Sequence, residues 1–115
     1  MTNMVARKTV TVPKDKDAEN ALDYDEATPD QLLEVLLTDE EFDELWAAGV
    51  FDIMNEITGA MIDYFESAEI VEKEKLEKVL ESDAFTKDAV VDKLAQIKVL
   101  FEEALERGTG VYFFF

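Results

Sequence analysis

Short apolar segments near the two ends of the chain predict two strands, the first from its alternating pattern and the second from its length and aromatic content. Within Ala6–Pro13 (ARKTVTVP) valines alternate with threonines, and the proline ends the run. Gly110–Phe115 (GVYFFF) is too short and too aromatic to be a helix. We therefore expect a minimal sheet in which an N-terminal strand, Thr9 to Val12, pairs with a C-terminal strand, Val111 to Phe115.

Between these strands apolar residues recur at helical spacing, which predicts four or five helices. Thr28 with Gln31 and Thr38 with Glu41 form two capping boxes, a pattern typical of helix starts. Residues 14–27 show no helical period and few large apolar side chains, so we expect an acidic, mobile loop there. The expected helices cover residues 28–37, 38–48, 50–67, 71–82 and 86–107.

Residues 50–67 (VFDIMNEITGAMIDYFES) are the most apolar part of the chain and predict a central helix that the others surround. A glycine inside a helix costs about 1 kcal/mol relative to alanine, so Gly59 indicates a close approach by another backbone, from a partner or within the fold. The polar residues of this segment recur at helical spacing and form one acidic line. This line consists of Asp52, Glu56, Asp63 and Glu66.

The predicted fold class is therefore α+β and mostly helical, with a single domain over residues 1–115. A chain of 115 residues with 48% apolar content supports one hydrophobic core. No apolar run approaches the roughly 20 residues that span a bilayer, and no apolar signal core follows the basic pair near the N-terminus. We expect a cytoplasmic protein.

The residue types that the chain lacks restrict its chemistry. It contains no Cys and no His, which excludes disulfides, thiolate zinc sites and cysteine or histidine catalysts. No spacing pairs a nucleophile with a base or places glycines around a phosphate. We expect no enzyme activity and no cofactor, and an all-carboxylate magnesium or manganese site remains open.

The segment Asp15–Glu26 (DKDAENALDYDE) follows the ligand spacing of an EF-hand calcium loop. Its flanks do not fit, because an EF-hand loop lies between two helices, whereas a strand pattern precedes this segment and a new helix start at Thr28 follows it. Asn20 also stands where the glycine belongs. We interpret the segment as a solvated linker that binds calcium no better than millimolar, with a calcium sensor as the alternative.

The net charge favours one class of partner. The chain has 11 Lys and Arg against 28 Asp and Glu, which gives a charge of −17. Such a charge repels phosphate backbones and anionic lipids, so we expect neither nucleic acid nor a membrane as a direct ligand. Residues 15–66 contain most of the acids and a single basic residue, Lys16. A basic protein is the partner that this surface would attract.

Two groups of acids form the predicted partner-binding surface. The first group lies at the start of the helix expected at residues 38–48, where acids also favour the helix dipole. The second is the acidic line of the central helix, which is alternatively the solvent side of a buried helix. The predicted partner-binding residues are Asp39, Glu40, Asp43, Glu44, Asp52, Glu56, Asp63 and Glu66.

Two segments carry a resemblance to a group of known proteins. Residues 45–70 (LWAAGVFDIMNEITGAMIDYFESAEI) and 100–115 (LFEEALERGTGVYFFF) are similar, in apolar spacing and in a few Gly and acidic positions, to small acidic cytoplasmic proteins of bacteria. Several of those proteins are immunity proteins that neutralise a cognate toxin. The resemblance implies a stoichiometric inhibitor rather than an enzyme, and it brings no catalytic or binding motif with it.

The expected function is therefore that of a non-enzymatic, acidic inhibitor that neutralises a basic partner such as a toxin. One alternative is a phage-encoded DNA mimic that inhibits a nucleic-acid-binding defence protein. Another is an assembly chaperone or adaptor that covers basic or apolar segments of another subunit. All of these need acids on a rigid scaffold, so the sequence leaves them open.

Overall fold

The chain ends pair at the centre of a sheet that is larger than expected. In the computed structural model, which describes residues 8–63 and 66–115, β1 (Lys8–Pro13) and β4 (Val111–Phe114) are antiparallel neighbours. β2 (Leu32–Leu37) pairs with the other side of β1, and β3 (Ser67–Ile70) with the other side of β4. The predicted pairing of the two ends is confirmed, but the minimal sheet is wrong, because the strand order is β2-β1-β4-β3.

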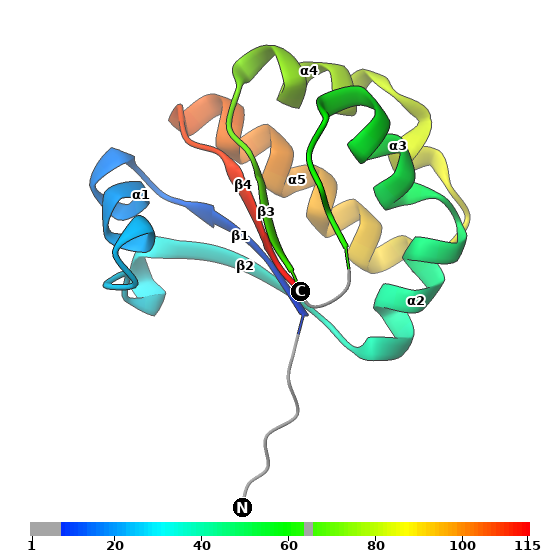
Figure 1. The fold of residues 1–115 in the computed structure, drawn as a ribbon, viewed down its shortest axis with the longest axis horizontal. Helices are drawn as coiled ribbons and strands as arrows, with labels where there is room; N and C mark the ends of the chain where they lie inside the picture. The colour runs from blue at the N-terminus through cyan, green and yellow to red at the C-terminus, as the bar shows by residue number, and fades with distance from the viewer. Residues whose placement is uncertain (1–7, 64–65) are drawn as a thin grey trace, which may run out of the picture.

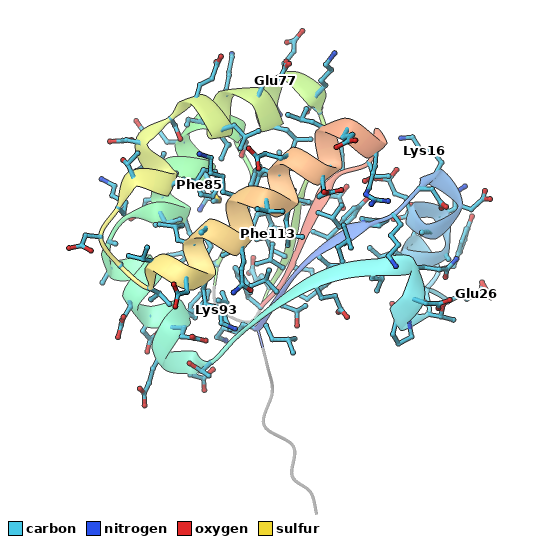
Figure 2. All side chains as sticks on the ribbon, turned by 180° about the vertical axis from the view of Figure 1, so that it is seen from behind. Lys16, Glu26, Glu77, Phe85, Lys93 and Phe113 are labelled. Carbon is cyan, nitrogen blue, oxygen red and sulfur yellow. The ribbon has the colours of Figure 1, made fainter. Side chains whose placement is uncertain are left out.

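Helices connect the strands and make the described part of the chain an α+β fold (Figure 1). Figures 1 and 2 show α2 to α5 gathered around one side of the sheet, whereas α1 lies apart from them near the far end of β1. None of the described helices is long and apolar enough to cross a bilayer. The α-helices are α1 (Lys16–Asp23), α2 (Asp39–Ala47), α3 (Val50–Thr58), α4 (Lys73–Glu81) and α5 (Val91–Arg107), and the 3-10 turns are Pro29–Gln31 and Asp83–Thr86.

The hydrophobic core lies between the sheet and helices α2 to α5. Phe113 of β4 is fully buried in it, with its ring centroid 6.5 Å from that of Phe51 on α3 and 6.4 Å from that of Phe101 on α5. Because side chains alternate along a strand, Tyr112 and Phe114 point to the opposite face of the sheet. We call this second side the open face, and α1 covers only part of it.

The segment predicted as a helix over residues 28–37 is mainly the strand β2. The capping interaction is present, since the Gln31 side chain accepts a hydrogen bond from the Thr28 N–H at 3.0 Å, but it begins only a 3-10 turn. In β2, Val35 and Leu37 are buried while Glu34 and Leu36 are exposed. Pairing with β1, which is distant in sequence, buries this alternating face and overrides the helix preference of the leucines.

The predicted central helix is half as long as expected. α3 ends at Thr58, where Gly59 adopts the left-handed conformation of a helix C-terminus with a φ of +74°. The Asn55 side chain then holds the following segment, because its amide donates to the Ile62 carbonyl at 3.0 Å and accepts from the Ile62 N–H at 2.9 Å. The chain turns back into β3, and residues 64 and 65 of the predicted helix lie outside the described residues.

The acidic loop expected over residues 14–27 contains the helix α1. Asp15 begins this helix, since its Oδ1 accepts a hydrogen bond from the Ala18 N–H at 2.8 Å. Ala18 is 1% exposed, and α1 packs on β1. The short helix therefore has an apolar contact that the acidic composition of the segment conceals.

The remaining helix predictions agree with the structure more closely. α2 and α4 confirm the helices expected at residues 38–48 and 71–82. The last helix ends at Arg107 before Gly108 as predicted, but α5 begins at Val91 rather than Thr86. Thr86 instead closes the second 3-10 turn.

Candidate functional site

All eight acids predicted to bind the partner have exposed side chains. Four of them lie on α2, and two lie on α3, which follows α2 directly. Asp39 also has a role within the fold, because its Oδ1 is 4.0 Å from Nζ of Lys8. Glu41, between them, forms the capping box with Thr38. Part of the negative charge on α2 therefore stabilises the helix start.

The predicted acidic line along one helix is not formed. Asp52 and Glu56 are four residues apart on α3 and share a face. Asp63 comes after the end of α3, and Glu66 lies directly before β3. The helical arrangement of four carboxylates is therefore wrong, because the helix that would align them stops at Thr58.

A different set of acids meets between α1 and the open face of the sheet. They line a hollow of about 290 Å³ that contains three carboxylates and one ammonium group. We call this site the acidic hollow. Its lining residues are Lys16, Glu19, Asn20, Asp23, Glu69, Val71 and Tyr112.

The sheet register and the helix spacing place the acids of the hollow. Tyr112 of β4 is directly paired with Glu69 of β3 and with Thr11 of β1. Side chains of directly paired residues lie on the same face of a sheet, so Glu69 stands next to Tyr112. Glu19 and Asp23 are four residues apart on α1 and share the helix face that looks onto Tyr112.

The Tyr112 hydroxyl connects the sheet to α1. It donates a hydrogen bond to Oε2 of Glu19 at 3.0 Å, and Nζ of Lys16 donates to Oε1 of the same carboxylate at 3.2 Å. The side chain of Glu19 is only 13% exposed, whereas that of Lys16 is 74% exposed. Glu19 is thus nearly buried between a tyrosine below it and a lysine that solvent reaches.

The pKa of Tyr112 reflects the electrostatics of the acidic hollow. Burial raises the pKa of its hydroxyl well above the usual 10.0, and the hydrogen bond to Glu19 raises this pKa further, as do the negative charges of Glu19, Glu69 and Asp23. The hydroxyl therefore stays protonated and acts as a hydrogen-bond donor. Carboxylates that disfavour a tyrosinate also favour a cation at the same place.

The acidic hollow suits a cationic group better than any reacting one. An ammonium or guanidinium group entering it would find carboxylate acceptors, with which charged donors form the strongest hydrogen bonds. The one hydroxyl in the lining that has an adjacent carboxylate base is that of Tyr112, and its raised pKa disfavours the ionised form that would react. Within residues 8–63 and 66–115, no group of three or more acidic side chains is arranged to hold a metal ion.

Sequence reasoning missed the residues of this hollow. For Glu19 and Asp23 a signal exists, because Ala18 and Leu22 are four residues apart behind the helix cap Asp15 and indicate a short amphipathic helix. For Glu69 and Tyr112 there is none, since their proximity depends on the pairing of strands that are about 40 residues apart in sequence.

Comparisons with known proteins leave the function to be argued from this geometry, since no family model, no curated protein and no solved structure matches the chain.

Proposed function

We propose that this chain is a non-enzymatic inhibitor that binds a basic partner protein, such as a toxin, and that the acidic hollow receives a lysine or arginine side chain of that partner. The observation that carries this proposal is the position of Glu19, Asp23 and Glu69 around the buried Tyr112 hydroxyl, whose pKa is raised by burial and further by these three carboxylates. The hollow is concave, pre-formed and rich in acceptors, as a receptor for a single cationic anchor needs to be.

The remaining acids would act at longer range. Exposed carboxylates on α2 and α3 contribute to a net charge of −17, which speeds the approach of a basic protein and makes its association rate sensitive to salt. In this division of roles, the surface charge steers the partner and the acidic hollow holds it. A DNA mimic would use the first effect without the second, because it needs a charged outer surface rather than one anchored side chain.

The test uses a synthetic arginine-containing peptide and variants that change net charge equally. Asp23→Asn with Glu69→Gln removes two charges from the acidic hollow, and Glu102→Gln with Glu106→Gln removes two from exposed positions on α5. We expect the first pair to weaken peptide binding by about tenfold or more, since about 1.4 kcal/mol corresponds to tenfold in affinity. The second pair should change it little. Calorimetry at two salt concentrations gives both affinities.

A third variant, Glu40→Gln with Glu44→Gln, examines the acids on α2. It should slow association at low salt while leaving dissociation nearly unchanged. Equal losses from all three variants would show that net charge alone drives binding, which contradicts an anchored side chain. A loss confined to the α2 variant would shift the site to that helix and favour DNA mimicry.

A further inference from the structure

The strand β2 leaves one of its two edges without a strand partner in the described residues. β2 pairs with β1 only, and it lies at the end of the strand order β2-β1-β4-β3. Its sequence, LLEVLL, contains a single charged residue. An apolar edge strand with few charges is a template onto which another extended segment can add.

Two hydrogen bonds define which backbone groups point outward from this edge. The Gln31 carbonyl, just before β2, accepts from the Lys14 N–H on the β1 side. The Leu36 carbonyl instead accepts from Nζ of Lys93 on α5 at 2.6 Å. Because N–H and C=O of one residue point to the same side in an antiparallel strand, Leu36 and Glu34 direct theirs outward. Within the described residues, no hydrogen bond is formed by the N–H or the C=O of Glu34.

An apolar groove runs beside this edge, between β2 and α5. Figure 2 shows α5 crossing the sheet with β2 as the outermost strand below it. Lys93 lies at the N-terminal end of α5. The groove has a volume of about 340 Å³, and Val99 in its wall is 50% exposed. Its lining residues are Leu33, Glu34, Val35, Gln96, Val99, Leu100, Glu103 and Arg107.

The charges around the groove select the occupant. Arg107 forms an ion pair with Glu103 at 2.8 Å, whereas Lys93 donates to the neutral Leu36 carbonyl and keeps its positive charge at that end of the edge. Glu34 is exposed and forms no ion pair with any described residue. At the middle of the edge the unpaired charge is the negative charge of Glu34, and the Lys93 ammonium lies two residues further along, at Leu36. A second copy of this chain would bring another charge of −17 to the contact, which disfavours self-pairing.

We propose that β2 binds an extended basic segment of another protein as a fifth strand of the sheet. Backbone hydrogen bonds join the added strand to the outward N–H and C=O of Glu34. A lysine or arginine stands opposite Glu34, because directly paired residues share a face. The residues on either side of that lysine point into the groove against Val35 and Val99, and these positions are apolar. This site is separate from the acidic hollow and does not depend on it.

The probe is a synthetic peptide of about eight residues that alternates valine and lysine, which is long enough for one strand. Two N-methylated versions of it have the same composition. Methyl groups on the lysine amides block the hydrogen bonds that face β2, whereas methyl groups on the valine amides point away from it. Calorimetry measures the three affinities. We expect the lysine-methylated peptide to bind at least about tenfold more weakly than the unmodified peptide, and the valine-methylated peptide to bind as tightly as the unmodified one.

Two variants test the same contact from the protein side. Glu34→Pro removes the outward N–H without removing a hydrogen bond to β1, as proline is tolerated on an edge strand, and Glu34→Gln removes only the charge. Binding should be lost in the first and weakened in the second, and amide exchange at Glu34 should slow when the peptide binds the unaltered protein. Where Glu34→Pro does not fold, the paired methylated peptides give the result alone.

The outcomes that overturn the proposal are distinct. Undiminished binding of the lysine-methylated peptide, or of the unmodified peptide to Glu34→Pro, excludes strand addition at this edge. Equal binding of a valine and glutamate peptide contradicts the charge selection at Glu34. A dimer of the unaltered protein in sedimentation, absent in Glu34→Pro, assigns the edge to a second copy instead. Loss of binding to the acidic hollow leaves this proposal unaffected.

Discussion

The Tyr112 hydroxyl donates a hydrogen bond of 3.0 Å to the Glu19 carboxylate and so attaches α1 to the central strand β4. α1 has only eight residues, and the residue that it buries is Ala18. A helix of this length is marginal in water without tertiary contacts. The tyrosine therefore both holds the helix in place and keeps the wall of the acidic hollow formed.

Tyr112→Phe should destabilise the fold by about 1–3 kcal/mol, because the variant leaves a nearly buried carboxylate without its neutral donor. The loss should be concentrated in α1, whose amides should exchange faster with solvent than those of α5. Urea unfolding and hydrogen exchange measure the two effects. As a control, Glu19→Gln keeps an acceptor for the hydroxyl and should retain more of the protection of α1. Unchanged exchange in α1 after Tyr112→Phe would contradict the role of this bond.

The alkaline stability of the protein should depend on Tyr112. Burial and the nearby carboxylates raise the pKa of Tyr112 in the folded protein above the 10.0 expected for the unfolded chain. A raised pKa gives stability that is fully present below about pH 10 and declines as the pH rises further, by up to about 1.4 kcal/mol per pH unit for one group.

Phe does not ionise. The difference in free energy of unfolding between the wild type and Tyr112→Phe should therefore shrink between about pH 8 and about pH 11. Other tyrosines and the lysines are present in both proteins, so their contributions cancel in the difference. Unfolding free energies at the two pH values provide the comparison. A constant difference would mean that Tyr112 ionises with an ordinary pKa.

Asp15 should matter for α1 as a helix cap rather than as a calcium ligand. Its Oδ1 accepts a hydrogen bond from the Ala18 N–H, so Asp15→Ala should cost about 0.5–2 kcal/mol, whereas Asp15→Ser keeps an acceptor and should cost less. Thermal unfolding with and without calcium checks both parts. A calcium-dependent rise in stability at micromolar concentration, lost in Asp15→Ala, would instead restore the sensor hypothesis for residues 15–26.

Elements whose signals are local in sequence could be predicted. The start of α2 follows from Thr38 and Glu41, which form their capping box as expected, and Phe42 and Leu45 are buried on its inner face. The end of α5 follows from Gly108 in the same way. These features depend on contacts within a few residues, and the sequence displays such contacts directly.

Elements whose structure depends on contacts between residues far apart in sequence could not be predicted. Leucines favour a helix in isolation, yet LLEVLL is a strand because β1 lies along it. The acidic line on α3 failed for a related reason, since the bonds from Asn55 to Ile62 replace the next turn of the helix. The acidic hollow combines both cases. Its α1 residues have a local signal, whereas Glu69 and Tyr112 are neighbours only after the sheet forms.

Thr11→Val should stabilise the protein. Thr11 is 1% exposed on the open face of the sheet, and its hydroxyl has no hydrogen-bond partner among the described residues. Burying an unsatisfied hydroxyl costs roughly 1–3 kcal/mol, and valine has nearly the same shape and a higher preference for strands. We expect a gain of about 1 kcal/mol in the free energy of unfolding, measured with urea.

As a control, Thr109→Val at a similarly buried hydroxyl that donates to the Pro13 carbonyl at 2.9 Å should be destabilising. A loss of stability in Thr11→Val would mean that the hydroxyl is hydrogen-bonded.

Gly110→Ala should destabilise the sheet where β3 ends and β4 begins. A Cβ atom at this position would lie 2.6 Å from Cγ1 of Val71, 2.9 Å from the Ile70 carbonyl oxygen and 3.0 Å from Cα of Val71. Two of these contacts are with backbone atoms, so a side-chain rotation cannot relieve them, and overpacking of this kind costs about 1–3 kcal/mol. Truncating the neighbouring side chain in the double variant Gly110→Ala with Val71→Ala should therefore recover only part of the lost stability.

Gly108→Ala is the matched comparison, because a Cβ there meets nothing within 4 Å and is opposed only by the positive φ of +72°. Thermal unfolding should rank Gly110→Ala as the more harmful change if the close approach of β3 limits this position, and the reverse order would show that backbone conformation matters more.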